Sequence, residues 1–202
     1  MTNWQAATTK TYDESATALA EYFKGIGPRT LYIDLAFKLI GYKEHARVVE
    51  IGCGDARDAA EITERTDDYI GFDPSRSMIE LAKQRLPEAS FAVADALSFT
   101  YPQDIDIVFA FSSLLHIDIH ECEQVILKLA SQIRSGGLLY VSLKESDHYE
   151  ERVKQDQFGE RMFYYYSVQD ILTMSQKFFD PVAEIHETIG HTKWFELGLR
   201  RK

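Results

Sequence analysis

A pair of glycines and a carboxylate stand where a nucleoside could bind. In Val49-Glu-Ile-Gly-Cys-Gly-Asp55, Gly52 and Gly54 directly follow an apolar run, so the backbone can turn sharply and approach a ligand with no Cβ in the way. Asp73 ends the next apolar run, 19 positions after Gly54, and an acidic side chain there can accept both hydroxyls of a ribose. The combination indicates a ligand that contains a nucleoside.

The charges of this turn distinguish between nucleoside cofactors. A dinucleotide site would have Gly or Ala at position 57, where this chain has Arg57. Glu50, Asp55 and Asp58 outnumber that arginine, and their negative balance would repel a pyrophosphate at the start of a helix. S-adenosylmethionine carries a sulfonium and an ammonium group and has no phosphate, so acidic residues attract it. The pattern predicts S-adenosylmethionine as the cofactor and disfavours a nicotinamide-dependent oxidoreductase.

Further residues belong to the predicted cofactor site. Asp95 follows a third apolar run, where its carboxylate can accept from the adenine amino group. Met78 or Ile79 offers an apolar face to the adenine ring. Cys53 lies between the two turn glycines, where a small side chain packs, and we expect it to be unreactive.

One histidine is the candidate for chemistry on the substrate. His116 follows the fourth apolar run, at the end of a parallel sheet where ligands bind, and a neutral imidazole there could act as a general base. A structural histidine held by hydrogen bonds is the alternative. The neighbouring Asp118, His120, Glu121 and Cys122 look like metal ligands, but Asp118 and Glu121 have the spacing of a helix capping box. We therefore predict no metal site.

Aromatic and N-terminal side chains are further candidates. The segment Phe163-Tyr-Tyr-Tyr166 could wall the acceptor pocket and face a cationic methyl group, since aromatic faces attract cations by about 0.5 to 2 kcal/mol. Packing in the core explains these rings equally well. Tyr12 and Arg29 could close over the cofactor and bind its carboxylate, although exposure at the surface is the commoner fate of such residues.

The elements that must position these residues follow a βαβ rhythm, which is typical of an α/β fold with a parallel sheet. We expect strands over residues 47–51, 69–73, 91–94, 105–111 and 138–143, and a closing hairpin of strands over 182–188 and 194–199. Helices are expected over 13–40, with a break at 25–28, near 56–66, around Met78, from Asp118, and from Ser167. We expect Gly136-Gly137 to end the helix that begins at Asp118, and residues 200–202 to form a solvated tail.

The length of 202 residues suits one domain. Within one domain (residues 1–202) we expect a helical cap over 1–45, a cofactor-binding core over 46–143, a possible substrate insertion over 144–166 that begins with the polar stretch 144–160, and a last helix with closing strands over 167–202.

The motifs resemble those of the class I S-adenosylmethionine-dependent methyltransferases. The resemblance rests on residues 48–58, 71–78 and 93–96, and it extends through 109–116, 135–141 and 161–167. It implies a Rossmann-like, doubly wound, seven-stranded sheet that is mostly parallel with an antiparallel last strand and has helices on both faces. The cofactor would lie over the ends of strands one to four. Ala56 departs from the glycine that many relatives have in the turn.

The resemblance also implies roles for single residues. Glu50 and the turn from Gly52 to Gly54 would hold the methionine part, Asp73 the ribose, and Asp95 with Ala96 the adenine. The matching segments also place Pro74, Phe111 and Ser112 in the site. The Asn/Asp-Pro-Pro-aromatic signature of enzymes that methylate nucleic-acid amino groups is missing, because Phe111-Ser-Ser-Leu stands after strand four.

Composition narrows the partners. The formal net charge of −10 opposes attraction to nucleic-acid phosphates, and no run approaches the roughly 18 apolar residues of a membrane helix. The two cysteines show no disulfide spacing, which favours the cytoplasm. We therefore expect a cytoplasmic methyltransferase that acts on an oxygen or nitrogen of a small-molecule metabolite, with the oligomeric state left open. The alternatives are a non-catalytic S-adenosylmethionine-binding protein and, less favoured, a methyltransferase that acts on protein or nucleic acid.

Overall fold

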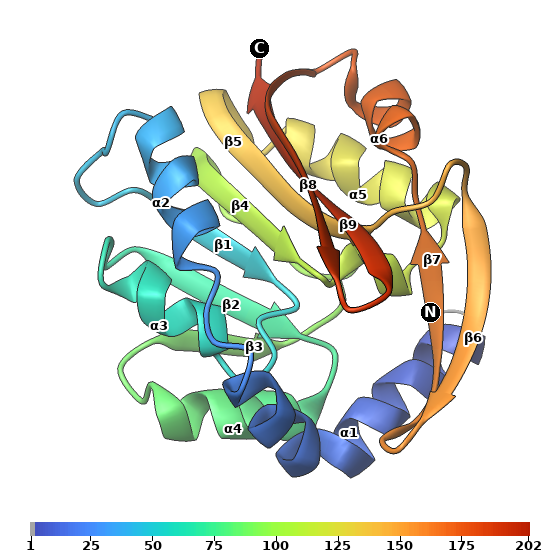
Figure 1. Ribbon diagram of the computed structural model, residues 1–202. Helices are drawn as coiled ribbons and strands as arrows, with labels where there is room; N and C mark the ends of the chain where they lie inside the picture. The colour runs from blue at the N-terminus through green and yellow to red at the C-terminus, as the bar shows by residue number, and fades with distance from the viewer. Residues whose placement is uncertain (1–2) are drawn as a thin grey trace.

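A computed structural model describes residues 3–202, and it shows a central sheet between two layers of helices (Figure 1). The helices are α1 (Asn3–Lys24), α2 (Thr30–Leu39), α3 (Arg57–Thr63), α4 (Arg76–Arg85), the 3-10 helix η1 (Leu114–His116), α5 (Ile119–Ala130) and α6 (Val168–Ser175). The strands are β1 (Val48–Ile51), β2 (Tyr69–Asp73), β3 (Ser90–Val93), β4 (Ile105–Phe111), β5 (Ile133–Lys144), β6 (Glu150–Asp156), β7 (Gly159–Tyr165), β8 (Phe179–Ile189) and β9 (Thr192–Arg201).

The main sheet has seven strands in the order β3-β2-β1-β4-β5-β9-β8. Strands β1 to β5 are parallel, and β9 runs antiparallel to both β5 and β8. This confirms the predicted doubly wound fold with an antiparallel last strand. The sheet places the carboxyl ends of β1, β2, β3 and β4 at one edge, where a ligand can reach all of them.

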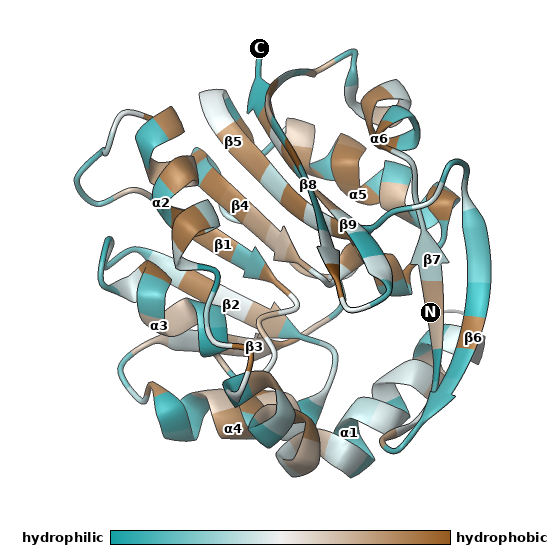
Figure 2. Cartoon of the chain, viewed as in Figure 1, coloured by the Kyte–Doolittle hydropathy of each residue, from teal (hydrophilic) through white to brown (hydrophobic). Residues whose placement is uncertain are grey.

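Alternation along the strands divides the core into two layers. On β4, Val108 and Ala110 face the layer that includes α5 and α6, whereas Ile107, Phe109 and Phe111 face the layer that includes α2 and α3. Every residue of β4 is buried because helices cover both faces of the sheet. Figure 2 shows hydrophobic residues along β4 and β5 in the middle of the sheet.

Two expectations are wrong, one about where helix α5 ends and one about the last residues of the chain. Helix α5 ends at Ala130, and Gly136 and Gly137 lie inside β5, where a Cβ on Gly137 would come within 2.9 Å of the Ile105 carbonyl oxygen. These glycines permit a close strand approach beside a register shift between β4 and β5 and do not cap a helix. Residues 200–202 are not a solvated tail, because Arg200 and Arg201 belong to β9 and donate to the carbonyl oxygens of Leu39 and Ala130.

Helices α6 and α5 begin with different side-chain caps. Ser167 and Asp170 form the complete reciprocal box at the start of α6. Asp118 caps α5 by accepting from the backbone N–H groups of His120 and Glu121. The Glu121 carboxylate accepts a hydrogen bond from Gln5 on α1, and the backbone N–H of Asp118 also interacts with it.

Residues 144–166 contain a hairpin, β6–β7, that forms a separate two-stranded sheet. The hairpin lies beside α1 at one side of the molecule (Figure 1), and β6 is hydrophilic (Figure 2). Thr8 of α1 accepts from the Met162 N–H, and Ser15 of α1 donates to the Phe158 carbonyl oxygen. The N-terminal helix and the hairpin therefore form one wall. Among the helices of residues 3–202, none is long and apolar enough to cross a membrane.

Candidate cofactor and acceptor site

The turn between β1 and α3 depends on its glycines. Gly52 has a φ of +70°, and a Cβ there would lie 2.4 Å from the Ser113 Cβ. Gly54 has a φ of +53° and open space where its Cβ would be. The N–H groups of Gly52 and Cys53 donate to the Phe72 carbonyl oxygen, which fixes the turn against β2. Ala56 takes the left-handed conformation as well, so the site accommodates the missing third glycine.

Asp73 lies at the carboxyl end of β2, beside this turn. Its carboxylate accepts from the Gly54 N–H at 3.1 Å and from the Ser75 N–H at 2.8 Å. Burial raises the pKa of Asp73 to about 6, although the two backbone hydrogen bonds oppose the rise. The side chain lines the main cavity together with Gly52 and Gly54, so the structure brings these three predicted residues together.

Asp95 and Ala96 line the same cavity at the end of β3. Asp95 accepts from the N–H groups of Leu97 and Ser98, both at 2.9 Å, and from the Ser98 hydroxyl at 2.7 Å. Partial burial raises its pKa, but these hydrogen bonds outweigh burial and leave the pKa lowered. Asp95 is thus an ionised group that also shapes its own turn.

The charge count made from the turn's sequence is wrong, because arginines from distant segments reach it. Asp58 accepts from the Arg29 guanidinium at 2.7 Å and from Arg57 at 2.8 Å. Asp55 pairs with Arg85 of α4 at 2.6 Å. Two of the three acids that the sequence counted against a pyrophosphate are therefore neutralised.

Other predicted cofactor residues differ in their position. Tyr12, Arg29, Cys53, Arg57, Pro74, Met78, Phe111 and Ser112 all line the cavity. Arg29 donates to the Ser112 hydroxyl at 2.6 Å and lies over the Phe111 ring. Glu50 does not line the cavity: it is buried, accepts from the Tyr69 hydroxyl at 2.5 Å, and burial raises its pKa to about 8. Its predicted role toward the methionine part stays a prediction. Burial also raises the pKa of the Cys53 thiol, which agrees with an unreactive cysteine.

The cavity as a whole fits a bound nucleoside cofactor. Its volume is about 770 Å³, and it runs from the ends of β1 to β4 to the β6–β7 hairpin. Three hydrogen-bond donors of its lining residues are buried without an acceptor in the described part of the chain: Arg57 Nε, Ser113 Oγ and Arg161 Nε. Such groups are costly unless a ligand or water satisfies them. Together with the open space at Gly54, they indicate that this cavity binds a polar ligand.

His116 lies where the cavity turns toward the hairpin. Its Nδ1 is 2.8 Å from the Met162 carbonyl oxygen, which can only accept, so Nδ1 carries the proton. Nε2 then accepts from the Tyr12 hydroxyl at 3.0 Å. Burial lowers the pKa of His116 to about 3. The histidine is therefore neutral, and its one free lone pair already has a partner.

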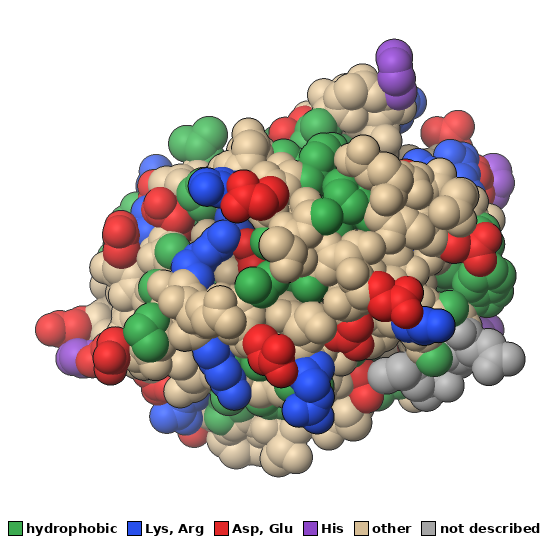
Figure 3. Space-filling model, turned by 90° about the horizontal axis from the view of Figure 1, so that it is seen from below, with side chains coloured by type: hydrophobic (Ala, Val, Ile, Leu, Met, Phe, Trp, Pro, Cys, Tyr) green, Lys and Arg blue, Asp and Glu red, His purple; other side chains and the backbone are tan. Residues whose placement is uncertain are grey.

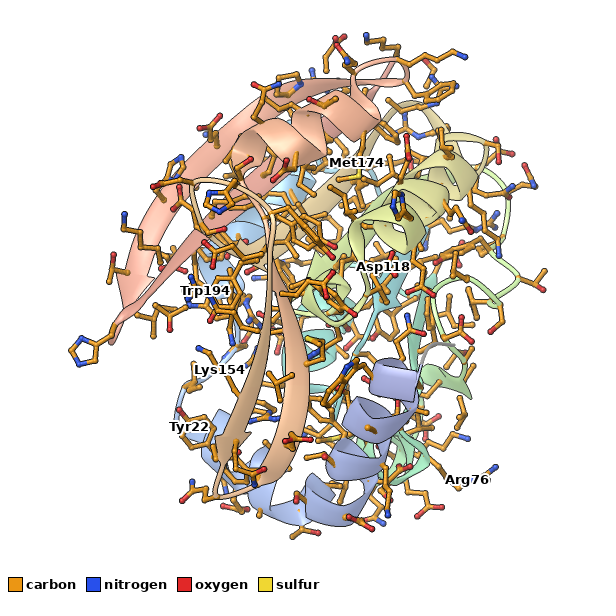
Figure 4. The ribbon with its side chains drawn as sticks, turned by 90° about the vertical axis from the view of Figure 1, so that its right-hand side faces the viewer. Tyr22, Arg76, Asp118, Lys154, Met174 and Trp194 are labelled. Atoms are coloured by element: carbon orange, nitrogen blue, oxygen red, sulfur yellow. The ribbon has the colours of Figure 1, made fainter. Side chains whose placement is uncertain are left out.

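Beyond His116 the cavity wall becomes cationic, which the sequence did not reveal. Lys144 Nζ lies 3.4 Å from the centroid of the Phe163 ring. The Arg161 guanidinium and Lys154 Nζ lie 5.4 and 5.8 Å from the same centroid. Figure 4 shows Lys154 on the hairpin between Tyr22 of α1 and Trp194 of β9. Phe163 lines the cavity as predicted.

Two rings of the aromatic segment pack elsewhere. The Tyr164 ring stacks on Tyr149, and the Tyr166 hydroxyl donates to the Ile117 carbonyl oxygen. The Tyr165 ring lies 5.7 Å from Lys144 Nζ and 5.3 Å from Lys154 Nζ but does not line the cavity. Phe163 is therefore the residue of this run that lines the cavity. Within residues 3–202, no group of three or more His, Cys, Asp or Glu side chains is arranged to hold a metal ion, and Asp118 and Glu121 have the helix-start contacts given above.

The strand order and the row of carboxylates at the strand ends define a Rossmann-like cofactor domain. Residues 48–137 match the family model described as a methyltransferase domain. The trans-aconitate 2-methyltransferase of Variovorax paradoxus is 28% identical over 150 residues, which cover 72% of this chain and 52% of that protein. The protein of the same name from Delftia acidovorans is 33% identical over 104 residues, which cover 49% and 38%. The chain thus spans about half or less of the curated relatives it matches.

Solved structures show the same fold. A 1,6-didemethyltoxoflavin-N1-methyltransferase from Burkholderia thailandensis, solved with its substrate and S-adenosylhomocysteine, superimposes with a TM-score of 0.76 at 15% identity and covers 100% of this chain and 91% of its own. A methyltransferase structure from Listeria monocytogenes has a TM-score of 0.71 at 13% identity and covers 85% and 98%. The chain therefore has the fold of solved methyltransferases, and its residues 48–137 resemble the methyltransferase-domain family.

Proposed function

We propose that this chain transfers the methyl group of S-adenosylmethionine to a small-molecule acceptor. The observation that carries the proposal is the continuous cavity of about 770 Å³ that joins the cofactor residues to the β6–β7 hairpin. Its volume is in the range of pockets that hold drug-sized ligands. Because α1 and the hairpin wall the acceptor end, residues 144–166 act in this proposal as the substrate insertion. The names of the curated relatives, which refer to the small molecule trans-aconitate, support the same class of acceptor.

The cofactor end positions the nucleoside. The glycine turn brings backbone close to the ligand, the Asp73 carboxylate offers acceptors for the ribose hydroxyls, and Asp95 with Ala96 borders the adenine. Arg57 Nε supplies a buried donor that still needs an acceptor. S-adenosylmethionine, when bound, supplies a methyl carbon activated by its sulfonium, so the protein contributes chiefly by holding the acceptor in line.

The acceptor end lacks a free base at His116. The Tyr12 hydroxyl occupies Nε2, and the lowered pKa disfavours the imidazolium that proton abstraction would produce. In this proposal, His116 holds Tyr12 and the Met162 backbone in place. The acceptor atom then reacts with a lone pair that is available without proton removal by this histidine. A cytoplasmic location fits the two cysteines, Cys53 and Cys122, which are buried free thiols.

Methyl-labelled S-adenosylmethionine tests the proposal. The protein is incubated with a metabolite panel that includes trans-aconitate, and separately with RNA and with an unfolded protein, while calorimetry measures S-adenosylhomocysteine binding. We expect tight binding and label in a metabolite. Binding without transfer to any panel member would favour the non-catalytic alternative, and label in RNA or protein would favour a macromolecular acceptor.

A further inference from the structure

The acceptor end of the cavity is positively charged in a protein whose net charge is −10. Lys144 ends β5, Lys154 lies on β6 and Arg161 on β7. All three line the cavity and lie within 6 Å of the centroid of one ring, Phe163. On the face seen from below, in contrast, acidic and basic side chains are interspersed (Figure 3). We call Lys144, Lys154 and Arg161 the cationic cluster.

The protein provides too little negative charge for this cluster. Arg161 pairs with Asp156, but neither Lys144 nor Lys154 takes part in a salt bridge with any residue of 3–202. Lys144 is only 9% exposed and Arg161 only 7%. Arg161 Nε is also buried with no acceptor in the described part of the chain. Three cations therefore share one carboxylate.

Contact with aromatic rings does not compensate for this burial. A cation over an aromatic ring gains less free energy than the burial of an unpaired charge costs. The pKa of Lys144 is lowered to about 7, mainly by burial and then by the nearby Lys154 and Arg161. An anion in the cavity would offset both the burial of Lys144 and its repulsion by Lys154 and Arg161. Water at this place would solvate the cluster but would not neutralise it.

The position of the cluster identifies the ligand that would bring this anion. The cofactor residues, with Asp73 and Asp95, line the opposite part of the cavity, at the ends of β2 and β3. The cationic cluster lies on the other side of the Tyr12–His116 pair, next to Trp194. A ligand that reaches it from within the cavity occupies the acceptor end.

We infer that Lys144, Lys154 and Arg161 form a subsite for an oxyanion of the methyl acceptor. The inference rests on the proposed function and specifies the chemical class of its substrate: a small organic acid or phosphate ester, and not a cation or a neutral amine. The ammonium groups of Lys144 and Lys154 and the unpaired Arg161 Nε–H donate to the oxyanion. Carboxylate and phosphate share this chemistry, and the experiment separates them.

The test measures anion binding on protein saturated with S-adenosylhomocysteine. Citrate, succinate and glycerol 3-phosphate are titrated by calorimetry against the neutral compounds succinamide and glycerol. We expect at least one anion to bind ten times more tightly than its neutral counterpart, and the carboxylate and phosphate arms then show which oxyanion fits. Succinamide and glycerol binding as tightly as succinate and glycerol 3-phosphate would overturn the inference.

Variants assign the binding to the cluster. Lys154→Gln and Lys144→Gln should each weaken binding of the best anion about tenfold, because one charge-assisted hydrogen bond is lost. Lys10→Gln is the matched control, since Lys10 lies on the exposed side of α1 and pairs with Glu14. Affinity for S-adenosylhomocysteine should be the same in all variants.

The outcomes separate the two proposals. Lys154 is only partly buried, so Lys154→Gln is decisive even where Lys144→Gln fails to fold. Unchanged anion affinity in Lys154→Gln would overturn the subsite. If the unaltered protein does not bind S-adenosylhomocysteine, the proposed function itself is contradicted. Methyl transfer to neutral and anionic acceptors with equal KM would contradict only the subsite.

Discussion

The two ends of the cavity are built in opposite ways. The cofactor end has carboxylates at or just beyond the ends of β2 and β3, and each is held by N–H groups within its own turn or the adjacent one. The acceptor end consists of cations and aromatic rings from α1, β5 and the β6–β7 hairpin, which are far apart in the sequence. The comparison shows that the cofactor end depends on backbone geometry, whereas the acceptor end depends on tertiary packing. Substitutions at the two ends should therefore differ in what they change.

The largest effect is expected from Gly52→Ala at the cofactor end. The new Cβ would lie 2.4 Å from the Ser113 Cβ, in a backbone conformation that alanine rarely adopts. The left-handed conformation costs about 1–2 kcal/mol, and overpacking adds about 1–3 kcal/mol. We expect the free energy of unfolding to fall by about 2–5 kcal/mol and binding of S-adenosylhomocysteine to weaken, as measured by urea denaturation and calorimetry.

Gly41→Ala is the matched control for this substitution. Gly41 has a φ of +84° but open space around its missing Cβ, so it shares the conformational cost without the clash. Its free energy of unfolding should fall by only about 1–2 kcal/mol, and its affinity for S-adenosylhomocysteine should not change. Equal losses in the two variants would contradict the close approach between the turn and Ser113.

The cofactor end was predictable from the sequence because its signals are local. Gly52, Gly54, Asp73 and Asp95 each stand at the end of an apolar run, and the parallel sheet brings such ends to one edge. The same local reasoning failed for charge, since Arg29, which neutralises Asp58, comes from outside the motif. Tertiary pairing of this kind leaves no signal at fixed spacing.

The acceptor end could not be predicted in the same way. Residues 144–160 read only as a polar stretch, and their register in the β6–β7 hairpin decides that Lys154 pairs across from Arg161. Lys144 was expected only as the first residue of the insertion over 144–166, but it lies at the end of β5, where the hairpin and β9 cover it. The sequence predicted the strands of the closing hairpin over 182–199, but it did not predict which side chains the β6–β7 hairpin brings together.

The second largest effect is expected from Asp73→Asn. The amide keeps the volume of the carboxylate but loses its charge and one acceptor, so affinity for S-adenosylhomocysteine should fall by about 1.5–3 kcal/mol. The same affinity in the unaltered protein should fall as the pH drops below about 6, because Asp73 has a pKa of about 6 and protonation removes the acceptor. Calorimetry between pH 5 and 8 measures both.

Glu88→Gln is the control, because it removes an exposed carboxylate from the loop after α4. It should bind S-adenosylhomocysteine with the same affinity as the unaltered protein. Affinity of Asp73→Asn equal to that of this control would contradict the ribose assignment. Anion binding at the acceptor end should not change in either variant, which separates the two ends.

At the acceptor end, a smaller effect is expected: KM for an anionic acceptor should depend on pH. Because Lys144 has a pKa of about 7, its ammonium is present below that pH and is lost above it. Between pH 6 and 8 the charged fraction falls about tenfold, so KM for an anionic acceptor should rise by up to that factor. The groups that face Lys144 are Lys154, Arg161, Asp156 and His116, and His116 does not titrate in this range because its pKa is about 3.

Lys144→Arg provides the test, because arginine stays charged throughout this range. The variant should keep KM nearly constant from pH 6 to 8, while kcat in the unaltered protein should change much less than KM. A pH dependence of KM that persists in Lys144→Arg would show that another group is responsible.

The smallest effect is expected from Tyr12→Phe, which removes the hydroxyl that donates to His116 Nε2. A lost hydrogen bond to a partly buried acceptor costs about 1 kcal/mol, so kcat should fall by a factor of about five or less. Tyr42→Phe is the control, since Tyr42 is 62% exposed. A fall in kcat of a hundredfold or more would have the size expected for loss of general base catalysis. It would show that the Tyr12–His116 pair accepts a proton, and that the acceptor end performs proton transfer as well as binding.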